Sequence, residues 1–209
     1  MIRVAYGVPA YRRGIDIGHN YQAFSLGMLS ALVKDRIAVV SLHDADTCDV
    51  AHSRNLLLHS ALKSGADWLL MMDGDTFHVS ADTLTAPSQI LRMIEDANEH
   101  GAAVAAAPVK MRGRDGYNVA IRRGDEYIQI EREDIGDRMI PVERIGTACM
   151  AVNCHWIKDY WPEQPWFDTA QIPGEIPRRE GSDYRFCDAV RARGGAVLCD
   201  ARFEPKHVG

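Results

Sequence analysis

The sequence predicts an α/β fold in which helices flank a central, mostly parallel sheet. In its first half, short apolar runs alternate with segments of helical periodicity, the pattern of strand–helix–strand units. One run, ADWLLMMDGD at 66–75, is almost wholly apolar until Asp73 and indicates a strand that is buried on both faces. Because ligands of such sheets bind beyond the carboxyl ends of the strands, the residues after this run are candidates for a site.

The first half predicts four strands and three helices. The strands are expected at 2–8, 36–44, 67–73 and 102–110, and the helices at 19–34, 49–65 and 87–100. In the second helix Asp49 is a candidate N-cap and Gly65 a candidate end. The inward residues are expected to be Leu57, Leu58, Ala61 and Leu62 in the second helix and Ile90, Met93, Ile94 and Ala97 in the third.

The second half is less regular. Its expected elements are a hairpin at 117–131 that turns at Gly124-Asp125, a buried strand at 143–153, a long loop at 158–182, a helix at 182–195, and a final strand with an irregular tail at 196–209. A loop of this length in a compact domain is usually functional or mobile.

Composition argues against a general polyanion-binding protein, a disulfide-rich protein and a membrane-spanning protein. The 209 residues favour one domain, and the net charge of −5 gives no general signature of polyanion binding. The five cysteines form no CxxC pair, which favours reduced thiols over a disulfide framework. Because no run approaches the roughly 20 apolar residues of a membrane span, and the N-terminal run is too short for a signal peptide, we expect a cytoplasmic protein without a membrane partner.

The Asp73-Gly74-Asp75 segment carries the chemistry. Carboxylate oxygens at this point suit Mg²⁺ or Mn²⁺, and the glycine lets a ligand approach the backbone closely. Acidic residues after a strand can equally serve only to solvate a turn. The sequence has neither a Walker A loop nor a GxGxxG turn, so a metal would have to do the phosphate binding.

The order of motifs resembles that of the GT-A fold nucleotide-sugar glycosyltransferases, in particular short family-2-like members of bacteria and phages. The matching segments are Pro9-Ala10-Tyr11, HSRNLLLHSAL at 52–62, DWLLMMDGD at 67–75, VAAAPVK at 104–110, IGTACMAV at 145–152, GSDYRFCDAVRARGG at 181–195 and FEPKHVG at 203–209. The resemblance implies a single Rossmann-like GT-A domain over 1–209. Residues 1–108 would bind the nucleotide-sugar and 109–209 would form the acceptor side, including a small hairpin and loop region.

The resemblance also implies a metal site and a donor site. Asp75 and His207 would bind the metal, and Asp73 would bind either the metal or the donor ribose. His207 can otherwise be read as a tail residue. The implied donor-site residues are Pro9, Ala10 and Tyr11 around the nucleotide, Asp44 or Asp46 near the base, Arg54 at the diphosphate, Asn55 holding the loop, and Lys110 as added positive charge. Solvated positions explain Asp44, Asp46, Arg54 and Lys110 equally well.

Asp183 is the candidate general base. In inverting members of the family, the aspartate of a Glu-Asp pair deprotonates the acceptor hydroxyl, and here Ser182 replaces the glutamate. A carboxylate can act as a base when it is held within about 3 Å of that hydroxyl. The alternative is that Gly181-Ser182-Asp183 caps the following helix, and the two interpretations are compatible.

These features predict a metal-dependent glycosyltransferase that uses Mn²⁺ or Mg²⁺ and a nucleoside diphosphate sugar, with UDP-sugars favoured. The acceptor is expected to be a glycan or small molecule, or, as a close second, a hydroxymethylated base in DNA if the chain is phage-encoded and acts in the host cytoplasm. Two groups of residues bear on that choice: the aromatics Trp156, Tyr160, Trp161, Trp166 and Phe167, and the basic residues Lys110, Arg112, Arg114, Arg122, Arg123, Arg178 and Arg179. The alternatives are a non-catalytic nucleotide-sugar-binding module and a nucleotidyltransferase-like protein.

Overall fold

The protein is represented by a computed structural model. It describes residues 1–10, 26–27, 35–46, 49–78, 85–111, 113, 115–131, 134, 136–171 and 179–207. The helix expected at 19–34 therefore lies outside the described residues except for Leu26 and Gly27, which are helical.

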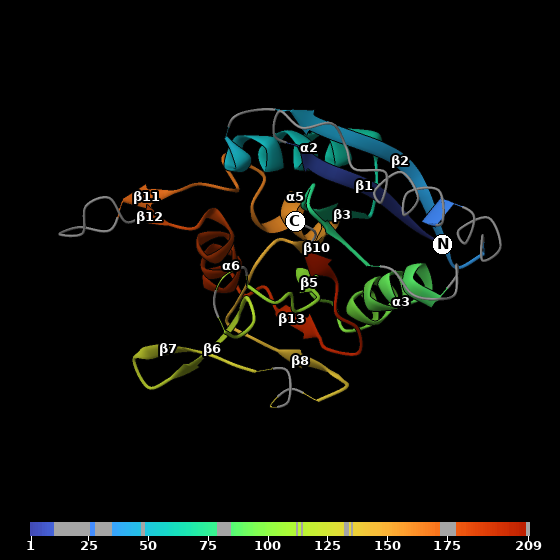
Figure 1. Ribbon diagram of the computed structural model, residues 1–209. Helices are drawn as coiled ribbons and strands as arrows, with labels where there is room; N and C mark the ends of the chain where they lie inside the picture. Colours follow the sequence, from blue (N-terminus) through green and yellow to red (C-terminus); the bar gives the residue numbers. More distant parts are fainter. Residues whose placement is uncertain are drawn as a thin grey trace.

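A seven-stranded mixed sheet forms the centre of the fold, in the order β2-β1-β3-β10-β5-β13-β8 (Figure 1). The strands are β1 (Ile2–Ala10), β2 (Ile37–Asp46), β3 (Trp68–Met72), β5 (Val104–Ala106), β8 (Met139–Pro141), β10 (Cys149–Asn153) and β13 (Val197–Asp200). All run in one direction except β10 and β8, which are antiparallel to their neighbours. The prediction of an α/β fold with a mostly parallel sheet is thus confirmed.

Helices cover both faces of this sheet. They are α2 (Val50–Ser64), α3 (Thr85–Glu99), α5 (Cys154–Tyr160) and α6 (Ser182–Ala192). Leu69 and Met71 of β3 belong to the core cluster that includes α2, α5 and α6, whereas Leu70 and Met72 belong to the cluster that includes α3. Successive side chains of a strand point to opposite faces, so a strand covered on both sides is apolar throughout.

The ends of α2 follow from local chemistry. The Asp49 carboxylate accepts hydrogen bonds from the backbone N–H groups of Ala51 and His52, and Gly65 ends the helix in the left-handed conformation with φ 71°. Both predictions for these residues are confirmed. The inward residues expected in the two helices are buried, except that Leu62 is only partly buried.

Three small sheets surround the central one. They consist of β4 (Thr76–Phe77) with β14 (Lys206–His207), β11 (Ala170–Gln171) with β12 (Arg179–Glu180), and the three strands β7 (Glu126–Gln129), β6 (Val119–Arg123) and β9 (Arg144–Ile145). The predicted hairpin is confirmed as β6–β7, and Gly124 takes φ 62° in its turn. Arg144 of β9 bonds Asp188 of α6, so this sheet is tied to that helix.

Three expected elements differ from the structure. The single strand predicted at 143–153 is divided into β9 and β10, which belong to different sheets, because the Gly146 N–H donates to the Asn118 carbonyl at 2.8 Å and draws the chain aside. Residues 158–160 at the start of the predicted loop are helical, because they belong to α5, which the Asn153 side chain caps. Strand β8, which precedes the strand predicted at 143–153, and strand β14 in the tail were not predicted; both are too short to show a sequence period.

Candidate functional site

The Asp73-Gly74-Asp75 segment forms a closed turn at the carboxyl end of β3. The Asp73 N–H donates to the Ala148 carbonyl at 3.1 Å, and the Thr76 N–H donates to the Asp73 carbonyl at 2.8 Å. Asp73 is half-buried and Asp75 is exposed. Two carboxylates with different access to solvent therefore lie two residues apart at the edge where parallel sheets bind ligands.

Strand β14 brings the end of the chain to this turn. His207 pairs with Thr76, so its backbone lies opposite the residue after Asp75. The His207 side chain lies outside the described residues. Among the side chains that are described, no group of three His, Cys, Asp or Glu could hold a metal ion. Asp73 and Asp75 nevertheless offer the oxygen donors that Mg²⁺ and Mn²⁺ favour, so the turn fits such an ion chemically.

Arg54 joins the turn to α6. Its Nη2 donates to both carboxylate oxygens of Asp73, at 3.1 and 3.3 Å, and its Nη1 donates to the Ser182 hydroxyl at 3.1 Å. The residue is only 6% exposed. Its Nε has no hydrogen-bond partner among the described residues. The Arg54 guanidinium therefore bonds both the residue that follows β3 and the first residue of α6.

Asp183 lies in the first turn of α6, immediately after Ser182. Burial raises the pKa of its carboxyl group above the ordinary value, while the Arg54 charge and a hydrogen bond from the Tyr184 N–H partly oppose this effect. Gly181 is the N-cap residue of α6, and no side chain caps the helix there. A Cβ atom on Gly181 would lie 2.5 Å from Oδ1 of Asp183, so the glycine leaves room for the carboxylate.

Asn55 fastens α2 to the segment that follows α5. Its amide nitrogen donates to the Ala51 and Phe167 carbonyls, and its oxygen accepts from the Trp166 and Phe167 N–H groups. The side chain is buried and bonded to backbone in all four contacts. Asn55 therefore organises the loop beside the site in this structure.

The other residues expected around the nucleotide lie on β1 and β2. Ala10 pairs with Asp46, and Asp44 lies two residues earlier in the same strand, so these backbones share the edge of the sheet where β3 ends. Pro9 is buried. The side chains of Ala10, Asp44 and Asp46, and the whole of Tyr11, lie outside the described residues.

The residues that bear on the acceptor divide between core and surface. Trp156, Trp166 and Phe167 are buried, whereas Tyr160 is 60% exposed. The described side chains of the basic group, Lys110, Arg122 and Arg123, include no buried one. Arg112, Arg114 and Arg178, and the side chain of Arg179, lie outside the described residues.

Two features near the carboxylates were missed by sequence reasoning. The sequence indicated Ser182 as a replacement for glutamate and as part of a helix cap, but not that its hydroxyl accepts a hydrogen bond from Arg54. Thr147 precedes the carbonyl that bonds Asp73; it is 1% exposed, and its hydroxyl has no partner among the described residues. The Gly146-Thr147 pair in the sequence was the available signal, since small and hydroxyl residues between two strands suit close approach of a ligand.

No protein-family model matches the chain, and no curated protein matches its sequence. Solved structures do match its fold. A197 from STIV has a TM-score of 0.57 at 16% identity over 100% of this chain and 86% of that protein. GalNAc-T7 with UDP, GalNAc and Mn²⁺ has a TM-score of 0.56 at 10% identity over 100% of this chain and 44% of that protein.

Apo-UDP-glucose pyrophosphorylase has a TM-score of 0.50 at 10% identity, with 100% of this chain and 92% of that protein covered. The chain thus shares its α/β fold with these proteins. At these identities the likeness concerns the fold alone, and the chain spans less than half of GalNAc-T7.

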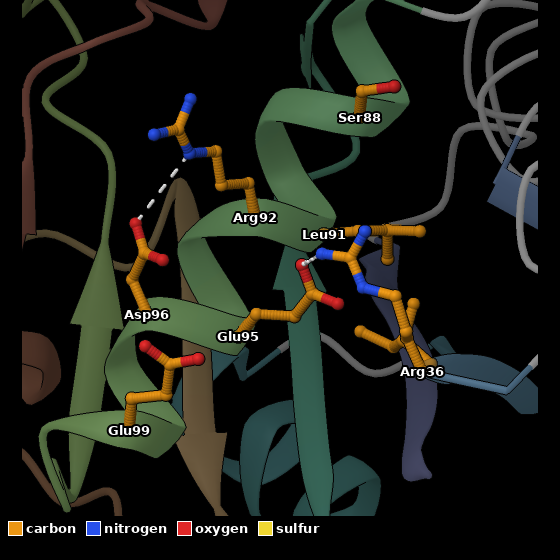
Figure 2. A pocket seen from close by; sticks show the side chains of 8 residues that line it. Arg36, Ser88, Leu91, Arg92, Glu95, Asp96 and Glu99 are labelled. Carbon is orange, nitrogen blue, oxygen red and sulfur yellow. Dashed lines mark hydrogen bonds and ion pairs between the residues drawn. The ribbon is translucent and has the colours of Figure 1, made fainter. Parts of the chain in front are cut away.

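A pocket of about 270 Å³ lies at α3 (Figure 2), and none of Asp73, Asp75 and Asp183 lines it. It is lined by Arg36, Ile37, Ser88, Leu91, Arg92, Glu95, Asp96 and Glu99. Figure 2 shows Arg36 directed at Glu95, with a contact of 2.6 Å, and Arg92 directed at Asp96. Ile37 is the first residue of β2 and Arg36 precedes it. The pocket therefore lies at the amino ends of the parallel strands, opposite the end where Asp73 lies.

The described cysteines offer no reactive thiol. Cys149, Cys154, Cys187 and Cys199 are free and buried. Burial raises the pKa of the Cys149, Cys154 and Cys187 thiols to about 12, so they are protonated at neutral pH and poor nucleophiles. No described helix is long and apolar enough to cross a membrane.

Proposed function

We propose that the protein is a metal-dependent glycosyltransferase, which moves a sugar from a nucleoside diphosphate sugar to an acceptor hydroxyl. The observation that carries this proposal is the convergence of the Asp73–Asp75 turn with Asp183 through Arg54 at one edge of the sheet. The likeness of the fold to that of GalNAc-T7, whose structure holds UDP, GalNAc and Mn²⁺, supports it. UDP-sugars are accordingly the favoured donors.

In the proposed reaction, Asp73 and Asp75, with His207, would hold Mn²⁺ or Mg²⁺. When bound, the ion supplies Lewis-acid stabilisation of the leaving diphosphate. The Asp183 carboxylate takes the proton of the acceptor hydroxyl as the oxygen bonds to C1 of the sugar. The bond from C1 to the phosphate oxygen breaks, and the nucleoside diphosphate leaves with the electron pair.

The two halves of the chain divide these roles. Residues 1–108 supply Arg54, Asp73 and Asp75, and the strand ends at Ala10 and Asp46 form one side of the nucleotide pocket. Residues 109–209 supply Asp183 and the acceptor side. Lys110 adds positive charge near the boundary of the two halves.

A glycan or small molecule is the proposed acceptor, ahead of DNA. An enzyme that acts on a base in DNA must unstack it, and exposed aromatic side chains help to hold the extruded base. Trp156, Trp166 and Phe167 are buried and serve the core. The described loop therefore offers few rings for stacking, which favours the smaller acceptor.

A thermal-shift panel of UDP-, GDP-, TDP- and CMP-sugars, each with Mn²⁺ and with EDTA, tests the donor half of the proposal. A ligand that binds only the folded state stabilises it by about 2.7 kcal/mol at a hundredfold excess over its Kd. We expect a shift with one nucleoside diphosphate sugar that is lost in EDTA. The absence of any shift would count against the proposal.

A nucleotidyltransferase is the second candidate, because the fold likeness to UDP-glucose pyrophosphorylase covers 92% of that chain. Product analysis separates the two. Incubation of the bound nucleotide-sugar with pyrophosphate yields nucleoside triphosphate if the second candidate is right, whereas transfer to an acceptor or to water yields nucleoside diphosphate. Binding without either product would support the non-catalytic module.

A further inference from the structure

Arg54 is placed between groups of the protein rather than toward open space. Both of its terminal nitrogens are engaged, one with the two oxygens of Asp73 and the other with the hydroxyl of Ser182. Ser182 lies 128 residues further along the chain. Because a guanidinium is a rigid planar fork, fixing its two ends also fixes the angle between the groups that it bonds.

The setting of Arg54 makes this arrangement stiff. Its side chain is 7% exposed, and a buried charge is costly unless it is paired. Asp73 is the carboxylate that pairs with it in the described part of the chain, since the other partner, Ser182, is neutral. The neighbouring Asn55 anchors the same turn of α2 to the segment at 166–167. The guanidinium is therefore held by its own helix as well as by its partners.

We propose that Arg54 is a positioning residue and not a ligand of the donor diphosphate. It holds the Asp73 carboxylate in one orientation toward the metal and, through Ser182, holds the start of α6 at a fixed place relative to that carboxylate. The metal site and Asp183 are thereby aligned by one side chain. This inference rests on the proposed function and replaces the diphosphate role that the family resemblance implied for Arg54.

The decisive experiment measures Mn²⁺ affinity, by electron paramagnetic resonance, in the presence of UDP and separately of UMP. It compares the wild type with Arg54→Gln. Groups that orient metal ligands typically contribute about 10- to 100-fold to metal affinity. We expect Arg54→Gln to weaken Mn²⁺ binding by such a factor and by the same factor with both nucleotides, because the effect passes through Asp73.

Other outcomes overturn the proposal. If Mn²⁺ affinity falls only in the presence of UDP, Arg54 is a ligand of the second phosphate. If Mn²⁺ affinity falls with neither nucleotide, Arg54 has no role at the metal. Full restoration by Arg54→Lys also overturns it, because lysine keeps the charge but lacks the planar fork whose two nitrogens reach Asp73 and Ser182. A wild-type protein that binds neither Mn²⁺ nor UDP instead refutes the proposed function itself, so the two failures are distinguishable.

Ser182→Ala tests the link to α6 with a smaller change, in case Arg54→Gln folds poorly. A hydrogen bond to a charged group is worth roughly a tenfold effect or somewhat more. We expect the transfer kcat to fall roughly tenfold while Mn²⁺ affinity changes little. An unchanged kcat overturns the link. Arg36→Gln is the matched control, since Arg36 pairs with Glu95 at the opposite edge of the sheet, and it should change neither quantity.

Discussion

The two ends of β3 carry the same pair of residue types in different settings. Before the strand, Asp67 accepts hydrogen bonds from the Arg3 N–H at 2.7 Å and from the Arg3 side chain, and Nε2 of His155 lies 2.8 Å from it. After the strand, Asp73 accepts from Arg54. The Arg3 side chain is 45% exposed, whereas that of Arg54 is 7% exposed.

The two ends of β3 differ in whether their buried polar groups have hydrogen-bond partners. At the amino end, burial alone would raise the pKa of Asp67, but the bonds from Arg3 and His155 outweigh it and lower that pKa. At the carboxyl end, Nε of Arg54 and the Thr147 hydroxyl lack partners among the described residues, and burial raises the pKa of Asp183. Structures seldom leave buried polar groups unsatisfied without a functional reason. This contrast supports the proposal that the carboxyl end binds a ligand, while the amino end contributes to stability.

Asp183→Asn should have the largest effect on activity. We expect transfer to fall by about 10²- to 10⁴-fold, the usual contribution of a general base, while donor binding persists. Because the folded-state pKa of Asp183 is raised, the ionised group costs stability that returns as pH falls through that pKa. The variant should therefore be no less stable than the wild type at neutral pH and should lose this pH dependence. Initial rates and urea unfolding measure both; transfer at the wild-type rate would refute the role of Asp183.

Gly181→Ala should displace the same carboxylate without removing it. The added Cβ would lie 2.5 Å from Oδ1 of Asp183, the movable end of a side chain, and the φ of −63° at Gly181 is open to alanine. A misplacement of about 1 Å can cost roughly 100-fold in rate. We expect a loss of that order in kcat with a normal circular dichroism spectrum. Full activity would show that the position of the Asp183 carboxylate is not critical.

Asp75→Ala should abolish the metal-dependent part of donor binding. The stabilisation by donor and Mn²⁺, about 2.7 kcal/mol at a hundredfold excess over Kd, should fall to the value found in EDTA. The exposed Asp75 makes this a test of the ligand rather than of folding. If donor and Mn²⁺ still stabilise the variant more than donor in EDTA does, Asp75 is not the metal ligand. If the donor stabilises it equally with and without metal, the metal is not needed for donor binding.

Asp67→Ala should show the opposite behaviour, at the other end of the strand. We expect a loss of about 0.5–1.5 kcal/mol in the free energy of unfolding, because the exposed donors of Arg3 and His155 lose their acceptor but can bond water, and no loss of donor binding. Since the folded-state pKa of Asp67 is lowered, its contribution is present at neutral pH and is lost as pH falls through that pKa. Urea unfolding at neutral and acidic pH measures this. A change in donor binding would show that the amino end of β3 also affects the ligand, which contradicts the contrast between the two ends.

Local chemistry made much of the fold predictable. The Asp49 cap, the Gly65 end and the uninterrupted strand before Asp73 each depend on a few neighbouring residues. The division of 143–153 depends instead on Asn118, which lies far away in the sequence and close to Gly146 in the fold. Strands β8 and β14 have three and two residues, too few for a period.

The candidate site was likewise predictable only where neighbouring residues or a known motif specify it. The Asp73-Gly74-Asp75 motif was visible because its carboxylates suit the proposed metal chemistry, and Asp183 was found through the family resemblance. The partners of Arg54 were not, because its bond to Ser182 spans 128 residues and no local pattern specifies it. His207 was found by resemblance, and the structure adds the pairing of its backbone with Thr76.

The order of strands in the central sheet has a consequence for how the chain folds. Strand β5 lies between β10 and β13, and both neighbours come later in the chain. A fragment of residues 1–108 would retain β2, β1 and β3 as a parallel group and leave β5 without either partner. Pairings between distant segments are slow to form, because loop-closure entropy is lost before the contacts are made. Residues 1–108 should therefore acquire their final shape only after β10 inserts between β3 and β5, so residues 109–209 act as a template for their completion.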